Sequence, residues 1–272
     1  MTLADNSITR TFAELRAAGR KTLLPFVTAG YPDLATTAAL LADFERRGVR
    51  ICEIGIPFSD PIADGPTIQA SYTAALERGV TSGDIFEMVR KYRSGGGKMA
   101  LVAMVSYSIV FRHGAQEYLS QAKAAGFDGM IIPDLPVDEA AGMEALAGEA
   151  GLCNVLLIAP TTPPDRRIEI ARHSQGFIYY ISVAGITGER AKLPRETIAA
   201  VAALRKHTET PVCVGFGISN PQTVETVCSV ADGAIVGSAI IHRITDAIGS
   251  PTDELVAKVG DFVGQLLAPL VK

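Results

Sequence analysis

The chain contains no tryptophan, and its cysteines are few and far apart. With 10 Phe and 7 Tyr in 272 residues, it lacks the aromatic-rich surface of many recognition modules. Cys52, Cys153, Cys213 and Cys228 include no C-x-x-C pair, which argues against a cysteine metal site. Three of them lie in apolar, strand-like runs, where reduced thiols pack as small hydrophobic side chains. The sequence therefore predicts no disulfides and a cytoplasmic location.

The chain also lacks a long apolar run and an excess of one charge. Its most apolar stretch, residues 100–111, contains two serines and is shorter than the ~20 residues that a membrane-spanning helix needs. Residues 1–15 have no basic segment followed by an apolar one, so they do not resemble a signal peptide. Lys+Arg number 25 against 29 Asp+Glu, and no basic stripe is interleaved with aromatics. These features argue against membrane and nucleic-acid partners.

A repeated pattern runs through the chain: a short apolar run, a polar turn and a helical stretch. Most of the runs are continuously apolar, which is typical of parallel strands covered on both faces. The predicted strands are residues 22–27, 50–56, 100–105, 129–132, 153–159, 177–181, 212–216 and 233–236. The predicted helices are residues 34–47, 115–125, 139–150, 164–173, 194–207 and 221–228, with two more within residues 66–92.

Two further helices bracket this array. Ile8, Phe12 and Leu15 are spaced for one helix face, and apolar residues recur every three or four positions from Leu255 to Leu270. No linker or charge block divides the chain. Eight uninterrupted βα units predict an α/β fold, a single (β/α)8 TIM barrel over residues 1–272, with extra N-terminal and C-terminal helices. The alternative is a doubly wound open sheet, which would usually have fewer strands at this length.

Chemistry in such a barrel takes place where the strands end, so polar residues at these points are informative. Glu53 stands inside an otherwise apolar strand. Inside the barrel its carboxyl would be desolvated, its pKa would rise, and it could act as a general acid or base. The alternatives are an outward-facing glutamate or one paired with a buried base. The next loop holds three prolines, Asp60 and Asp64, which suits either positioned carboxylates or an ordinary turn.

Glycine-bearing loops follow the last three predicted strands, at residues 184–188, 215–220 and 237–239. Glycines there let backbone N–H groups approach an anion, and the N-terminus of the helix after the eighth strand would favour the same negative charge. The pattern predicts a site for one phosphate group, with plain turns as the alternative. Tyr179 and Tyr180 adjoin on one strand, so one of them faces the barrel interior, where a packing role is the simpler interpretation. The histidines have no metal spacing, and no metal is expected.

Together these residues resemble the tryptophan synthase alpha subunit family. The segment from Glu53 to Gln69, EIGIPFSDPIADGPTIQ, looks like the family signature. Further similar stretches, in the same order along nearly the whole chain, are FVTAGYP at 26–32, PDLP at 133–136, SVAGITG at 182–188, GFGIS at 215–219 and GAIVGS at 233–238.

The resemblance implies a lyase of L-tryptophan biosynthesis. Its reaction would be the retro-aldol cleavage of indole-3-glycerol phosphate to indole and glyceraldehyde 3-phosphate. Glu53 matches the acid/base residue of the family, Asp64 matches the carboxylate that holds the indole N–H, and Tyr179 matches a tyrosine that assists near Glu53. Thr187 matches a residue of a loop that closes over the substrate. The positions that match the substrate phosphate site are Gly188, Gly217, Gly237 and Ser238.

The resemblance also implies a partner. Family members form an α2β2 complex with a beta subunit, and the loop that holds Asp60 resembles the surface that faces it. Pyridoxal phosphate is expected on the beta subunit only, and no cofactor on this chain. One departure concerns this surface: where the family usually has Tyr-x-Asn, this chain has Ser106 and Ser108 around Tyr107. Coupling to the partner and part of the indole pocket are therefore open to test.

Three other functions remain as alternatives. Another phosphate-binding barrel would ordinarily carry a catalytic lysine at the end of an early strand, whereas Lys21 and Lys91 precede strands. The chain could instead be a mainly regulatory partner subunit of low intrinsic activity, although both carboxylates are intact. It could also be a free-standing lyase that releases indole.

Overall fold

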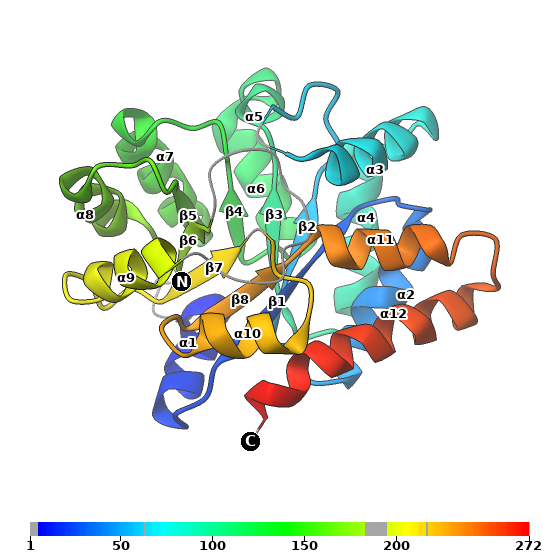
Figure 1. Cartoon of the computed structure of the whole chain (residues 1–272). Helices are drawn as coiled ribbons and strands as arrows, with labels where there is room; N and C mark the ends of the chain where they lie inside the picture. Colours follow the sequence, from blue (N-terminus) through cyan, green and yellow to red (C-terminus); the bar gives the residue numbers. More distant parts are fainter. Residues whose placement is uncertain (1–4, 63, 183–194, 216, 272) are drawn as a thin grey trace.

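The computed structural model describes residues 5–62, 64–182, 195–215 and 217–271, and its eight parallel strands form a closed barrel within a layer of helices (Figure 1). The strands follow the chain order around the barrel, and β8 pairs with β1. The predicted TIM barrel is confirmed, and the open-sheet alternative is wrong. The strands are β1 Thr22–Thr28, β2 Ile51–Gly55, β3 Ala100–Met104, β4 Gly129–Ile131, β5 Cys153–Ile158, β6 Ile178–Ile181, β7 Val212–Gly215 and β8 Gly233–Val236.

The helices pack on the outside of the strands, and α12 lies against α2 and α11. Among the described residues, no helix has both the length and the apolar character to cross a membrane. The helices are α1 Ser7–Ala17, α2 Leu34–Arg46, α3 Pro66–Glu77, α4 Ser82–Ser94, α5 Tyr107–His113, α6 Ala115–Ala125, α7 Val137–Ala150, α8 Pro164–His173, α9 Arg195–Leu204, α10 Pro221–Cys228, α11 Ser238–Asp246 and α12 Thr252–Leu267, which a 3-10 turn, Ala268–Leu270, follows.

The predicted elements differ from the observed ones mainly at two helices. Helix α5 was not predicted, because it follows β3 within one apolar stretch and is too short to show a helical period. The helix predicted over residues 194–207 ends at Leu204, and the next residues form a turn, in which the N–H of His207 donates to the Leu204 carbonyl. Pro194, predicted for its first turn, lies outside the described residues.

The register of the strands places Glu53 inside the barrel. Phe26 of β1 pairs with Glu53 of β2, so their side chains lie at one level on one face. The charge of Glu53 acts on Tyr179 of β6, on the other side of the barrel, which identifies this face as the interior. Tyr179 in turn pairs with Cys213 of β7. Alternate residues of all these strands therefore meet in one interior layer.

Helix α1 closes the amino-terminal end of the barrel. The Ile8 side chain lies only 2.8 Å from where a Cβ on Gly129 would be, and the rings of Phe12 and Phe177 lie 5.8 Å apart. Asn6, which is fully buried, donates from its amide to the carbonyls of Asp128 and Gly151. The extra N-terminal helix therefore serves as a plug at one end, and the loops at the other end are left to form a site.

Candidate active site

Glu53 is a buried carboxyl group in the barrel interior. Its side chain is 1% exposed, and its Oε1 atom has no hydrogen-bond partner among the described residues. Burial, and then the charge of Asp64, raise the pKa of the Glu53 carboxyl well above its ordinary value. A raised pKa keeps the proton on a carboxyl group to higher pH, which suits a group that must both donate and accept a proton.

Asp64 lies above Glu53, in the loop that joins β2 to α3. The loop is folded back on itself, since the N–H of Asp64 donates to the Pro61 carbonyl at 3.1 Å. The Gln69 side chain, in the first turns of α3, donates to the Asp64 carbonyl at 2.8 Å. Burial raises the pKa of the Asp64 carboxyl to about 7. Strand β2 thus positions one carboxyl group, hydrogen bonds within the loop and to α3 position the other, and the charge of Asp64 acts on Glu53.

Tyr179 faces the barrel interior and Tyr180 faces the helices. Tyr179 is 4% exposed, and its hydroxyl fills the space that a Cβ on Gly215 would need. Burial, and then the charge of Glu53, raise the pKa of Tyr179 well above its ordinary value, so its hydroxyl stays protonated. Tyr180 instead lies under the guanidinium of Arg167 on α8, 5.8 Å from its ring centre.

Two further aromatic rings, those of Tyr72 and Phe26, lie at the mouth of the barrel and were not identified from the sequence. The Tyr72 hydroxyl of α3 lies 2.6 Å from where a Cβ on Gly55 would stand, and the Phe26 ring approaches the same point. Only glycine leaves room for both rings at this position. The glycine two residues after Glu53 was the available signal, because a glycine inside a strand often marks a close approach.

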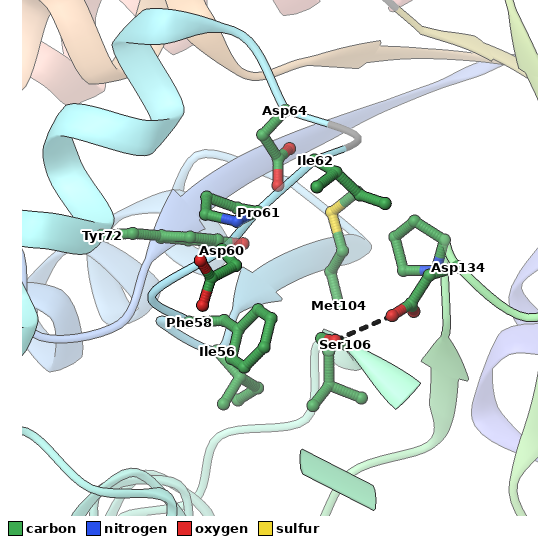
Figure 2. A pocket seen from close by; sticks show the side chains of 12 residues that line it. Ile56, Phe58, Asp60, Pro61, Ile62, Asp64, Tyr72, Met104, Ser106 and Asp134 are labelled. Carbon is green, nitrogen blue, oxygen red and sulfur yellow. Dashed lines mark hydrogen bonds between the residues drawn. The ribbon is translucent and has the colours of Figure 1, made fainter. Parts of the chain in front are cut away.

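The open space at this end of the barrel is lined by residues from the ends of β2, β3 and β4 (Figure 2). Ser106, at the start of α5, donates from its hydroxyl to the Asp134 carboxylate at 2.8 Å, and the N–H of Tyr107 donates to the same carboxylate. Ser106 also caps α5, since its hydroxyl accepts from the N–H of Ser108. The departure from the Tyr-x-Asn pattern is therefore a helix start tied to the β4–α7 loop. The residues that line the space are Ile56, Phe58, Asp60, Pro61, Ile62, Asp64, Tyr72, Met104, Val105, Ser106, Pro133 and Asp134.

The glycines expected to hold phosphate lie at the ends of β7 and β8. Gly217 has a φ of 78°, which other residues rarely adopt, and Gly237 immediately precedes α11. Helix α11 begins at Ser238, and no side chain caps the N–H groups of its first turn. Thr187 and Gly188 lie outside the described residues.

The side chain of Phe26 lies between the expected phosphate site at Gly237 and the carboxyl group of Glu53. A Cβ on Gly237 would touch Phe26 at 3.6 Å, and Phe26 pairs with Glu53 in the β1–β2 register. Asp60 is further out and exposed, and its carboxylate accepts a hydrogen bond from Ser59 at 2.6 Å. Within the described residues, no group of three or more His, Cys, Asp or Glu could hold a metal ion.

The fold is that of the TIM barrels, and the carboxyl groups and the phenol lie at the end of the barrel where enzymes of this fold carry their active sites. The profile of one family, described as the tryptophan synthase alpha chain, matches residues 12–266. Alpha chains from Rhodopirellula baltica and Geobacter sulfurreducens are each 44% identical to this chain, over 94% and 95% of its length and 95% and 97% of theirs.

Solved structures agree with the sequence matches. The tryptophan synthase subunit alpha of Legionella pneumophila has a TM-score of 0.89 at 33% identity, covering 97% of this chain and 98% of its own. A Mycobacterium tuberculosis tryptophan synthase structure has a TM-score of 0.88 at 32% identity, with coverage of 97% and 98%. The chain therefore belongs to the tryptophan synthase alpha chain family, and its role is that of a lyase in tryptophan synthesis.

Proposed function

We propose that the chain cleaves indole-3-glycerol phosphate to indole and glyceraldehyde 3-phosphate. The observation that carries the proposal is Glu53, a buried carboxyl with an unpartnered oxygen in the barrel interior, next to the second carboxyl of Asp64. In this cleavage the bond between indole carbon C3 and the hydroxyl-bearing side-chain carbon breaks. C3 must gain a proton, and the hydroxyl must lose one as the aldehyde forms.

Glu53 is suited to both proton transfers. Its neutral carboxyl gives a proton to C3, which turns the ring into an electron sink for the breaking bond. The carboxylate that remains then takes the hydroxyl proton, so Glu53 ends the cycle as it began. The raised pKa of Glu53 supports this role, because an ordinary carboxyl would be ionised at neutral pH and could not donate first.

Asp64 and Tyr179 would stabilise the charges that arise. Protonation of C3 places positive charge on the indole nitrogen, and the Asp64 carboxylate would hold the N–H at that point. Tyr179, whose pKa is raised most by burial and next by Glu53, would assist Glu53 with its protonated hydroxyl.

The phosphate of the substrate would bind at the ends of β7 and β8. Backbone N–H groups at Gly217 and Gly237, and Ser238 at the start of α11, would hold it, with Gly188 completing the site. Thr187 is proposed to close over the substrate and keep water away from the reacting atoms.

A beta subunit is the proposed partner, in an α2β2 complex. One of the similar solved structures is a tryptophan synthase from M. tuberculosis in an aminoacrylate-bound form, with a TM-score of 0.85 at 30% identity. The exposed Asp60 is proposed to face the beta subunit, and pyridoxal phosphate is expected on that partner. The steps assigned to this chain are proton transfers and substrate binding, which its own side chains and backbone can carry out.

The test is indole release from indole-3-glycerol phosphate by the purified chain, with and without a beta subunit, beside the variant Glu53→Gln. We expect slow release alone, a sharp rise with the partner, and a loss of at least about 100-fold in the variant, as for other general acid–base residues. Fast release that is unaffected by the partner would indicate a free-standing lyase. An absence of indole under both conditions would contradict the proposal.

A further inference from the structure

We propose that Tyr72 is a positioning residue for this reaction: when substrate binds, its hydroxyl donates a hydrogen bond to the Asp64 carboxylate and holds that carboxylate against the indole N–H. The inference rests on the proposed function and adds a residue that the family signature did not point to. Tyr72 and Asp64 come from α3 and from the loop before it, and they line the same open space (Figure 2).

The Tyr72 hydroxyl is placed at the mouth of the barrel. The side chain is 3% exposed, and the hydroxyl stands over Gly55, on the interior face two residues beyond Glu53. The hydroxyl of Tyr92 on α4, in contrast, donates a hydrogen bond to the carboxylate of Glu45. Among the described residues, none forms a hydrogen bond with Tyr72, so its donor is available to a group at the mouth.

Helix α3 fixes the ring relative to Asp64. Gln69 and Tyr72 are three residues apart, so they lie on neighbouring positions of one helix face. Gln69 donates to the Asp64 carbonyl at 2.8 Å, which ties this part of α3 to the loop. Ser71 and Thr28 of β1 share a hydrogen bond of 2.6 Å between their hydroxyls, which anchors α3 to the barrel. Tyr72 is therefore held on two sides and has little freedom to move away.

The two tyrosines at the mouth, Tyr72 and Tyr179, respond mainly to different carboxyl groups. After burial, the charge that most raises the pKa of Tyr72 is that of Asp64, whereas for Tyr179 it is that of Glu53. Each phenol thus interacts most strongly with a different carboxyl group, and the raised pKa keeps both hydroxyls as donors. Asp64 must be ionised to hold the indole N–H, although burial raises its pKa to about 7. A hydrogen bond to the carboxylate favours the ionised form.

A packing role alone does not account for the hydroxyl. The ring of Tyr72 covers Gly55 beside Phe26, and a phenylalanine would cover it equally well. The Tyr72 hydroxyl is also not among the fully buried atoms that lack a partner, such as the Tyr118 hydroxyl, and Tyr72 lines the open space where a ligand would bind. Among the described residues, the other titratable groups that line this space or interact with Asp64 are Glu53, Tyr179 and the carboxyls of Asp60 and Asp134.

The test compares Tyr72→Phe with the unaltered chain in the complex with a beta subunit, across pH 5.5 to 9. We expect kcat to fall about 10- to 100-fold, the value of one hydrogen bond to a charged group, while KM changes little. The acidic limb of the kcat profile should move to higher pH, because Asp64 loses a donor that favours its ionised form. The matched control is Tyr118→Phe, which removes a buried hydroxyl on α6 beside Phe86 and should leave both quantities unchanged.

A double-mutant cycle with Asp64→Asn shows whether the two side chains act together. If the hydroxyl acts through the carboxylate, Tyr72→Phe should lower kcat by less than about twofold when Asp64→Asn is already present. Equal effects of Tyr72→Phe in both backgrounds, or an unshifted acidic limb, would overturn the inference and leave the lyase function intact. An unaltered chain that releases no indole would instead overturn both.

Discussion

Glu53 is the residue whose burial has the clearest consequence for stability. Its carboxyl is inside the barrel without a paired cation among the described residues, and the nearest charge that acts on it has the same sign. Desolvation of this kind destabilises the folded chain whenever the group is ionised. A functional site that is unfavourable for folding is common in enzymes, and removal of the unfavourable group then stabilises the protein.

We therefore predict that Glu53→Gln stabilises the chain more at pH 8 than at pH 5. Since the folded pKa is raised, the folded state keeps its proton where the unfolded state has lost it, so the free energy of unfolding falls as pH rises above about 4.5. Glutamine has no such titration. Each unit of pKa difference is worth about 1.4 kcal/mol, so urea unfolding of both proteins at the two pH values should resolve the trend.

Titrating groups that do not interact with Glu53 cancel in this comparison, and the unpaired amide of the glutamine acts equally at both pH values. The difference between the two pH values therefore reports the charge of Glu53 together with its interaction with Asp64. A stabilisation that is the same at pH 5 and pH 8, or larger at pH 5, would show that the Glu53 carboxyl is not desolvated in the folded chain.

Single residues differed in how far the sequence could predict them. Glu53 stood out because a carboxyl inside an apolar strand violates the local pattern, and Asp64 because it follows that strand in a rigid loop. Tyr72 gave no such signal, since a tyrosine on the inner face of an amphipathic helix usually packs in the core. Its position over Gly55 depends on how α3 crosses the barrel mouth, which is a tertiary property.

At the scale of elements, the strands were predictable because both of their faces are covered. Their continuous apolar runs, and the prolines at the starts of α8 and α10, marked boundaries within one or two residues. Helix α5 was missed because its apolar residues continue the run of β3. The available signal was Ser106, a good capping residue directly after the strand.

Helix α1 offers a test of an element that supports the barrel at a distance from the site. The Asn6 side chain donates to two carbonyls and accepts from the N–H of Ile8, all of them buried. We predict that Asn6→Ala lowers the free energy of unfolding by about 3 kcal/mol, from the lost cap and two unsatisfied carbonyls. Indole release at 25 °C should stay within about twofold, because the site is at the other end of the barrel.

Urea unfolding measures this loss, and Ser7→Ala is its matched control. The Ser7 hydroxyl, one residue further on, accepts only an exposed bond from Arg10, so its removal should change stability by less than about 0.5 kcal/mol. An equal effect of the two substitutions would mean that Asn6 does not anchor the plug.

At the scale of the whole molecule, the two ends of the barrel differ: one end is closed by a helix, and the other carries the candidate active site. The amino-terminal end is filled by α1, and the carboxyl end carries the carboxyls, the phenols and the loops. We propose that the chain forms one domain, because a closed barrel leaves a single continuous core inside its helices. Family membership and the barrel were predictable from sequence patterns, whereas the arrangement of side chains at the mouth required the fold.

The open end also carries the surface proposed to meet the beta subunit. A groove beside the Asp60 loop is lined by residues of that loop, including Phe58, and of α5, including Ile109. Phe111 of α5 is 72% exposed, which is unusual for a large apolar side chain and marks a candidate contact. Ser106, which caps α5, donates a hydrogen bond to Asp134 at the pocket. A partner bound at α5 would therefore contact a helix that is hydrogen-bonded to the lining of the site.

We predict that Phe111→Ser weakens binding of a beta subunit at least about tenfold and reduces its activation of indole release, because a buried aromatic anchor is lost from the interface. Release by the chain alone should not change, since Phe111 does not line the pocket. Titration calorimetry gives the affinity, and indole assays with and without partner give the activation. Ile248→Ser, at a 49% exposed apolar residue between α11 and α12, is the matched control and should leave both unchanged. Equal weakening by the two variants would place the partner elsewhere, and lost release by the chain alone would show that α5 supports the site directly.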